Sequence, residues 1–266
     1  MNDFSSPVIK KLDSYAGFFE TERATYKGVL SKVLYFMALI GLGIGAFFLL
    51  HQQLASSGAA VSARAEGFVI YQTEMLAFMG CIAFILVSSL VNAFKPVAIP
   101  LFGSVYAAAT GYWITFISRT YAYAYGGIVI EALVLTILLI AVMSFLYFSG
   151  LVRINDKVRT VVYSAFMAMF LGSLVFAVIY FVAPNSSVVR MVSAVNNGPL
   201  GIVFAFLGVA IGCFFLLDDF DTITNVVERG LDRKYEWFAA YGLVVSVVYL
   251  YIKILQLLAR LQRNRR

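Results

Sequence analysis

Seven long apolar segments follow one another along the chain, separated by short polar or charged stretches. As a helix, each segment can cross a hydrocarbon core about 30 Å thick, which needs ~20 residues. Polar and apolar residues do not alternate as they do in the strands of a membrane barrel, so the pattern predicts helices and excludes sheet in the spans. The predicted spans are Val33–Leu50, Phe68–Phe94, Ala98–Ser118, Gly126–Val152, Val161–Ala183, Leu200–Leu217 and Phe238–Leu258.

The pattern therefore predicts an all-α polytopic membrane protein, folded as a seven-transmembrane-helix bundle. The polar N-terminus has no apolar core of a signal peptide, so the first apolar segment is expected to remain as a span. We divide the chain into a cytoplasmic N-terminal segment (1–32), a transmembrane domain (33–258) and a basic C-terminal tail (259–266). The stretches 51–67 and 184–199 are expected to be polar loops.

The composition supports the membrane assignment and argues against nucleic-acid binding, metal binding and enzymatic activity. Hydrophobic residues make up 62% of the 266 residues and charged residues 13%, which predicts the lipid bilayer as the main partner. The net charge of +6 collects at span ends, where lipid headgroups explain it better than nucleic acid does. One histidine, two separated cysteines and no Gly-rich phosphate loop predict no metal site, no cofactor and no enzymatic activity.

The distribution of Lys and Arg predicts a cytoplasmic N-terminus by the positive-inside bias. On the outer side this orientation places only Arg64, Arg119 and Arg190. On the inner side it places Lys10, Lys11, Arg23, Lys27, Lys32, Lys95, Arg153, Lys157, Arg159, Arg229, Arg233 and Lys234. The tail opposes the bias with Arg260, Arg263, Arg265 and Arg266, and a re-entrant seventh segment would restore it. We favour a full crossing because the seventh segment is long enough.

Two pairs of small residues predict close helix packing. Gly41 and Gly45 lie in the first span, and Gly208 and Gly212 lie in the sixth. Glycines four residues apart share one helix face and allow two backbones to approach each other. The pairs therefore favour a compact bundle.

Ionisable residues within spans are the candidate functional residues, because each costs about 2.5–3.5 kcal/mol to insert unless it has a partner or a water-filled cavity. Asp218, Asp219 and Asp221 end the sixth span, with Asp218 and Asp221 on one face. Three like charges in one turn repel one another, so this group is a candidate proton sensor or cation ligand. The alternative is a solvated helix end at headgroup level.

Three further candidates lie in other spans. Glu131 and Lys253 are deep enough to suggest a structural ion pair or function, with snorkelling as the alternative. We expect Lys253 to pair with Glu131 or Asp221. Glu74 is close enough to the interface that snorkelling is favoured. His51 is interpreted as an interface residue without chemistry.

Three stretches together resemble the bacterial branch of the Bax inhibitor family of membrane proteins. They are Thr25-Tyr26-Lys27-Gly28-Val29-Leu30-Ser31-Lys32, Gly126-Gly127-Ile128-Val129-Ile130-Glu131-Ala132-Leu133-Val134-Leu135-Thr136, and the region from Leu217 to Leu258 with Phe220-Asp221-Thr222-Ile223 and Glu236-Trp237-Phe238. The resemblance implies a central seventh helix and a location in the inner or plasma membrane of a bacterium.

The resemblance also implies a function in ion homeostasis and stress response, through a pH-sensitive cation leak that conducts calcium. In the family, an aspartate at the end of the sixth helix and another in the seventh form the latch. Asp221 matches the first, but the second position falls on Ser246. Thr110-Gly111 stands where the bacterial branch usually has a glutamate, and Glu131 where a glutamine is common. Some relatives instead regulate a membrane-anchored AAA protease, which gives a non-conducting regulator as the alternative function.

Overall fold

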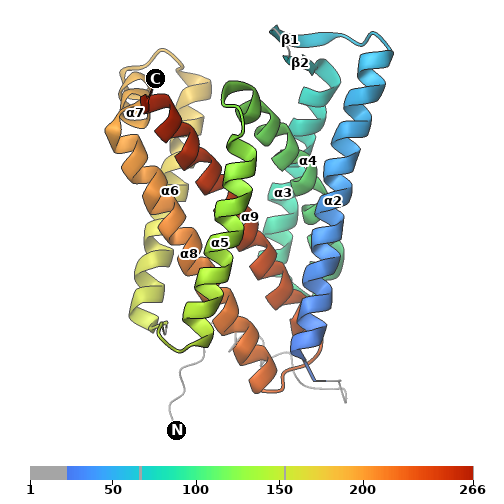
Figure 1. Ribbon diagram of the computed structural model, residues 1–266, viewed down its shortest axis with the longest axis vertical. Helices are drawn as coiled ribbons and strands as arrows, with labels where there is room; N and C mark the ends of the chain where they lie inside the picture. Colours follow the sequence, from blue (N-terminus) through green and yellow to red (C-terminus); the bar gives the residue numbers. More distant parts are fainter. Residues whose placement is uncertain (1–22, 66–67, 153, 266) are drawn as a thin grey trace.

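The computed structural model describes residues 23–65, 68–152 and 154–265. Seven of its helices are long and apolar enough to cross a membrane, which confirms the predicted all-α bundle (Figure 1). They are α2 (Tyr26–Ser56), α3 (Gln72–Phe94), α4 (Ile99–Ala124), α5 (Ile128–Phe148), α6 (Asp156–Val182), α8 (Pro199–Glu228) and α9 (Tyr235–Arg265). We call the end of the bundle where α2 begins the lower end, and the end where α2 stops the upper end, as drawn in Figure 1.

Two connections at the upper end have secondary structure that the sequence analysis did not predict (Figure 1). Strands β1 (Val61–Ala65) and β2 (Phe68–Tyr71) form an antiparallel hairpin, so the second span begins after a strand and not at Phe68. β-branched and aromatic residues favour this conformation once a hairpin partner is available. Helix α7 (Ser187–Asn197) occupies the expected polar loop, and the Ser186 hydroxyl caps it by accepting from the Val189 N–H at 3.3 Å.

Local capping chemistry sets the lower ends of several helices. The Thr25 hydroxyl accepts from the Gly28 N–H at 3.0 Å and starts α2. The Asn155 side chain accepts from the Lys157 N–H at 3.3 Å and starts α6. Gly230 follows the end of α8 with a φ of 62°, as expected for a helix-terminating glycine. These caps turn the chain at the lower end of the bundle.

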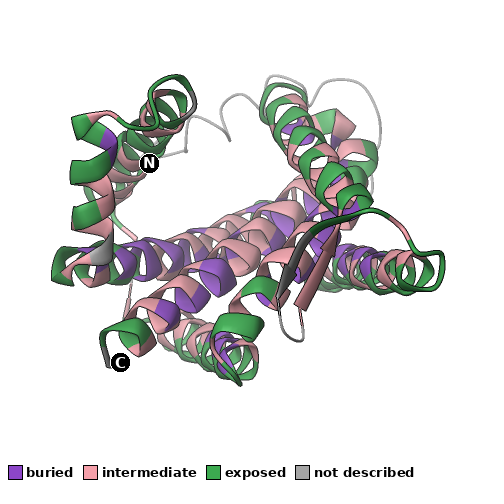
Figure 2. Ribbon diagram, turned by 90° about the horizontal axis from the view of Figure 1, so that it is seen from above, coloured by how far each residue is buried: buried purple, intermediate pink, exposed green. Residues whose placement is uncertain are grey.

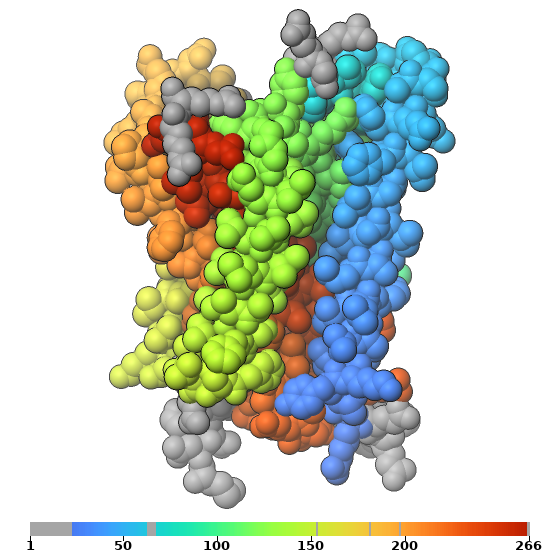
Figure 3. Space-filling view, in the orientation of Figure 1, coloured from blue at the N-terminus to red at the C-terminus, as the bar shows by residue number. Residues whose placement is uncertain are grey.

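Helix α9 is the central helix, as the family resemblance implied. It packs against α8, α2, α5 and α4. Buried residues gather on the helices in the middle of the bundle (Figure 2), and α5 crosses in front of α9 (Figure 3). α9 runs unbroken through Arg265 and reaches the upper end, which supports a full seventh crossing over a re-entrant segment. Residues 259–265 are the last turns of this helix.

One of the two predicted glycine pairs makes a helix contact. A Cβ at Gly208 would lie 3.0 Å from the Lys253 side chain, and one at Gly212 would lie 3.0 Å from Leu250, so this pair packs α8 on α9. The prediction for Gly41 and Gly45 was wrong, because nothing lies within 4 Å of a Cβ at either position. The close approach of α2 instead uses its intervening glycine: a Cβ at Gly43 would overlap the Ala108 carbonyl of α4, and one at Gly111 would overlap the Ile40 carbonyl.

Candidate functional site

The acidic cluster at the lower end of α8 holds an arginine from α6. Arg159 Nε donates to Asp218 Oδ1 at 2.7 Å, and its Nη2 lies 2.5 Å from the same oxygen. Nη2 also donates to Asp221 Oδ2 at 3.0 Å. Asp218 and Asp221 share one face of α8 because they are three residues apart. One guanidinium therefore bridges both carboxylates and ties α6 to α8.

Neutral side chains complete the coordination of these carboxylates. Tyr163, one turn after Arg159 on α6, donates its hydroxyl to Asp218 Oδ2 at 2.8 Å. Tyr147 of α5 lies 3.5 Å from Asp221 Oδ1, and Asn225 Nδ2 donates to Asp221 Oδ2 at 3.1 Å. Helices α5, α6 and α8 thus meet at this cluster. Sequence reasoning did not select Arg159 or Tyr163, because the partner of a carboxylate on another helix leaves no mark in the linear pattern.

Asp219 points away from this cluster, towards α9. Its carboxylate is hydrogen-bonded with Ser246, which is buried, and an added Cβ at Gly242 would lie 2.8 Å from Asp219 Oδ1. Asp219 Oδ2 is buried and has no hydrogen-bond partner among the described residues. An unsatisfied buried carboxylate oxygen is costly unless a proton or a cation compensates it. The family resemblance matched Asp221 and Ser246 to its two aspartate positions, whereas the structure places Ser246 beside Asp219.

The predicted ion pair of Lys253 is wrong. Asp221 is occupied by Arg159, and Glu131 is exposed at the start of α5, where its Oε2 accepts from Gln262 Nε2 at 3.3 Å. In the described part of the chain no carboxylate lies within ion-pair distance of Lys253. Its stem packs on Gly208, and Nζ lies 5.3 Å from the ring centre of Tyr249. A cation–π contact and an alkyl stem therefore replace the expected salt bridge.

Glu74 does not snorkel, which corrects the sequence interpretation. It has 0% of its surface exposed and accepts from the Tyr71 N–H at 3.0 Å, which satisfies the backbone N–H of the residue that precedes α3. His51 Nδ1 lies 2.5 Å from Glu74 Oε1, and Arg119 Nη2 lies 3.0 Å from His51 Nε2. Helices α2, α3 and α4 are thereby joined through side chains at the upper end. His51 is a structural link here, and not a bare interface residue.

A second buried ion pair joins α2 to α9 at the lower end. Lys32 forms a salt bridge with Glu236, which is 1% exposed. Glu236 Oε1 also accepts from the Thr25 N–H at 2.8 Å, so it binds the residue that caps α2. Both residues fall in stretches that carry the family resemblance, but their pairing across the bundle was not predicted.

The sequence model of the family described as Bax inhibitor 1 like matches residues 6–263. The chain belongs to the Bax inhibitor 1-like family. No curated protein matches it. Membership agrees with the seven membrane helices and the central α9, and it makes the chain an integral membrane protein. The candidate residues do not form a metal site: within the described residues no three His, Cys, Asp or Glu side chains come together to hold a metal ion.

Against the pattern of the Bax inhibitor 1-like family, two departures in this chain have structural explanations. Thr110-Gly111 stands where the resemblance places a glutamate, and at Gly111 the close contact with the Ile40 carbonyl leaves no room for any side chain. Ser246 stands where the resemblance places a second aspartate, so its neighbour Asp219 has a hydroxyl and not a second carboxylate beside it. Within the described chain, Arg159 of α6 is the only charged group that binds the aspartates at the end of α8.

Proposed function

We propose that this protein is a pH-sensitive cation leak, and that the bridge from Arg159 to Asp218 and Asp221 keeps it closed. The bridge supports the proposal because it is the charged contact between α6 and α8; beside it, α6 contacts α8 and α9 through the rings of Tyr163 and Phe166. No residue of the hydrophobic stretch of α6 is buried, and its main neighbours are α7 and α8. Loss of this charged contact would weaken the attachment of α6 and allow the helix to move. Calcium is the ion that the family resemblance implies as the transported species.

Protonation would open the bridge. While the two carboxylates are charged they hold the guanidinium, which stabilises the closed state. As pH falls and the carboxylates take up protons, the attraction to Arg159 is lost, so α6 is released and flux rises. Asp219, which lies on the opposite face and towards α9, supplies an interior acceptor for a passing cation. Protonation would thus shift the equilibrium between a closed and an open state of the same chain, without any other ligand.

The test is calcium and potassium flux into proteoliposomes at several pH values between about 5 and 8. Wild type should conduct more at low pH. Arg159→Gln should conduct at pH 8 as wild type does at pH 5, with a flattened profile. Asp221→Asn should behave in the same direction. Lys157→Gln is the matched control, since Lys157 is exposed on the same helix turn, and it should leave the profile unchanged.

Two results would count against this proposal. Absence of flux from the wild type at every pH would remove the channel function. Flux with an unchanged pH profile in both Arg159→Gln and Asp221→Asn would retain conduction but remove the bridge as its sensor. Asp219→Asn separates the roles further: it should lower the flux of the open state while leaving the pH of half-opening in place.

We also propose that the lower end faces the cytoplasm and that the protein resides in the inner or plasma membrane of a bacterium. The excess of Lys and Arg in the segments at the lower end supports this orientation. Single cysteines replacing Ser57 and Ser149, after replacement of Cys81 and Cys213 by alanine, place one label at each end. An impermeant reagent added outside cells should label Ser57→Cys and not Ser149→Cys. Labelling of the Ser149 position alone would reverse the orientation.

The second candidate function is the regulation of another membrane protein by direct binding. The observation that favours it is the exposed apolar surface of α6, which includes Met167, Phe170, Leu171, Leu174 and Val178. Lipid alone can cover such a surface, so the two functions differ in what happens without a partner. Flux by the pure protein supports the leak, whereas a silent protein that binds a defined membrane protease through α6 supports the regulator.

A further inference from the structure

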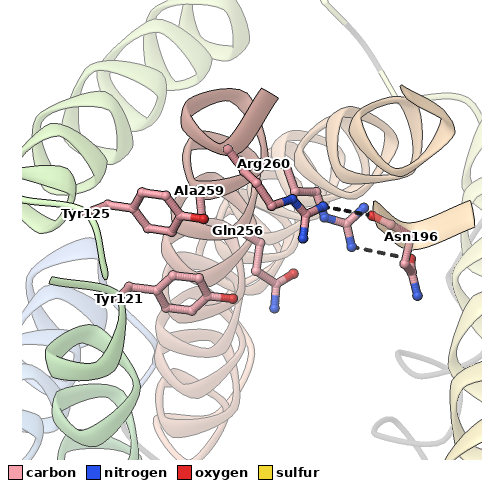
Figure 4. A pocket seen from close by; sticks show the side chains of 7 residues that line it. Tyr121, Tyr125, Asn196, Gln256, Ala259 and Arg260 are labelled. Atoms are coloured by element: carbon pink, nitrogen blue, oxygen red, sulfur yellow. Dashed lines mark hydrogen bonds between the residues drawn. The ribbon is translucent and has the colours of Figure 1, made fainter. Parts of the chain in front are cut away.

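A cavity of about 290 Å³ opens at the upper end of the bundle, away from the acidic cluster (Figure 4). Three helices contribute to it: α4 and its C-cap, α7, and the last turns of α9. Its polar lining consists of Tyr121, Tyr125, Asn196, Gln256, Arg260 and Arg263. The volume is sufficient for a group of roughly ten or more non-hydrogen atoms, at the lower limit of ordinary small-molecule sites.

Hydrogen-bond donors dominate the lining. Arg260 and Arg263 lie three residues apart on one face of α9, and Gln256 lies one turn before Arg260 on the same face. The side chains of Tyr121 and Tyr125 extend from the opposite wall towards α9 (Figure 4). Guanidinium groups only donate, and tyrosine hydroxyls and a glutamine amide can do so too. This set matches a ligand that carries several acceptor oxygens.

Among the described residues no carboxylate lies within ion-pair distance of Arg260. Arg260 donates to the Gly201 carbonyl and, at 3.4 Å, to Asn196 Oδ1, both of which are neutral. These two bonds leave other donors of the guanidinium available. Lys253 lies two turns below on α9 and, among the described residues, has no ion pair either. Glu131, the carboxylate at this end of α5, bonds to Gln262 instead.

We propose that this cavity binds a phosphate group, with Arg260 as its principal ligand. A guanidinium binds phosphate oxygens in a bidentate manner, and the charge of the anion would compensate the cations of α9. The tyrosine rings form an amphipathic wall for the organic part of a phosphate ester. The same chemistry is offered by free phosphate compounds and by the headgroup of an anionic phospholipid, since the cavity lies at the end of a membrane-spanning bundle. The proposal does not depend on the leak function.

The experiment compares the two sources with the full-length protein in nanodiscs. In phosphatidylcholine discs, inorganic phosphate is titrated and the midpoint of thermal unfolding is followed. In a second series, phosphatidylglycerol replaces part of the phosphatidylcholine, and bound lipid is counted by native mass spectrometry. Arg260→Gln should weaken binding about tenfold or more, because a hydrogen-bonded charge is lost. Arg190→Gln, an equal charge change at the same end but outside the cavity, should bind as the wild type does.

Saturable binding in the first series assigns a free phosphate compound, and binding in the second alone assigns the headgroup; either supports the site if Arg260→Gln reduces it. Binding in neither series, or equal binding by Arg260→Gln, overturns the proposal. Arg260 also links α9 to α7 and α8, so its replacement could impair folding. Tyr121→Phe removes only a hydroxyl and should weaken binding about 2- to 10-fold. Full affinity in Tyr121→Phe together with Gln256→Leu would also overturn the site.

Discussion

Ser246 of α9 is hydrogen-bonded to Asp219 of α8, while Asp221 lies on the other side of α8 and binds Arg159 of α6. The three aspartates at the end of α8 thus contact two different neighbouring helices: Asp218 and Asp221 contact α6, and Asp219 contacts α9. Asp218 and Asp221 form the face that binds the Arg159 guanidinium, and Asp219 lies on an interior face, where one of its oxygens has no hydrogen-bond partner among the described residues. A change at Ser246 should therefore act through Asp219, and a change at Arg159 through the other two.

Ser246→Asp should place two carboxylates side by side. When both are charged they repel, and when they share one proton they do not, so the variant should be less stable at pH 8 than at pH 5. When the pH is raised from about 5 to about 8, we expect the midpoint of thermal unfolding of this variant to fall by several degrees more than the midpoint of the wild type does. Ser246→Asn is close in size and uncharged, and it should follow wild type. Equal behaviour of the Asp and Asn variants would show that position 246 does not sense Asp219.

Arg159→Gln should lower the free energy of unfolding by about 1–3 kcal/mol, since it leaves Asp218 and Asp221 without their cation. The loss stays below that of a fully buried pair because the Asp221 side chain is 32% exposed. Adding Asp218→Asn should recover part of it. A double-mutant cycle in detergent measures the coupling, which we expect to exceed about 0.5 kcal/mol. Strict additivity would mean that the bridge contributes nothing to the folded state.

Lys32→Met should be among the most destabilising single changes at the lower end. It leaves Glu236 charged and buried, at a cost of about 3–5 kcal/mol. Combining it with Glu236→Gln removes the charge and keeps an acceptor for the Thr25 N–H, so the double variant should recover much of the loss. Lys27→Met, at an exposed position one turn earlier, is the control. Urea or thermal unfolding that ranks Lys27→Met and Lys32→Met equally would contradict the buried pair.

Lys253→Met should not destabilise the protein. Lys253 has an aromatic neighbour and, among the described residues, no carboxylate, so its removal breaks no ion pair and relieves an uncompensated charge. We expect a rise of about 2–4 °C in the unfolding midpoint, which corresponds to about 1 kcal/mol for a chain of this size. In the leak assay the same variant should pass more cations at low pH, because a positive charge in the bundle repels them. A large fall in the midpoint would indicate a partner for Lys253.

The number of spans, the all-α fold and the position of the charged residues near helix ends could be predicted from the sequence. These properties follow from segment length and local polarity: about 20 apolar residues cross a bilayer wherever they occur. The cap at Gly230 and the α8 contact face with Gly208 and Gly212 are equally local, because they depend on residues one or two turns apart. Even so, the same rule selected Gly41 and Gly45, which face no helix.

Only the tertiary structure decided which charges meet. Arg159 and Asp218 are 59 residues apart, and Lys32 and Glu236 are 204 apart, so no periodicity relates the members of either pair. The rotation of α8 about its own axis determines that Asp219, and not Asp221, faces Ser246. The sequence identified the charged residues within the membrane spans, since transfer of a charge into lipid costs free energy whichever span carries it. Which partner offsets that cost depends on how neighbouring helices are rotated and packed, and this is a property of the assembled bundle.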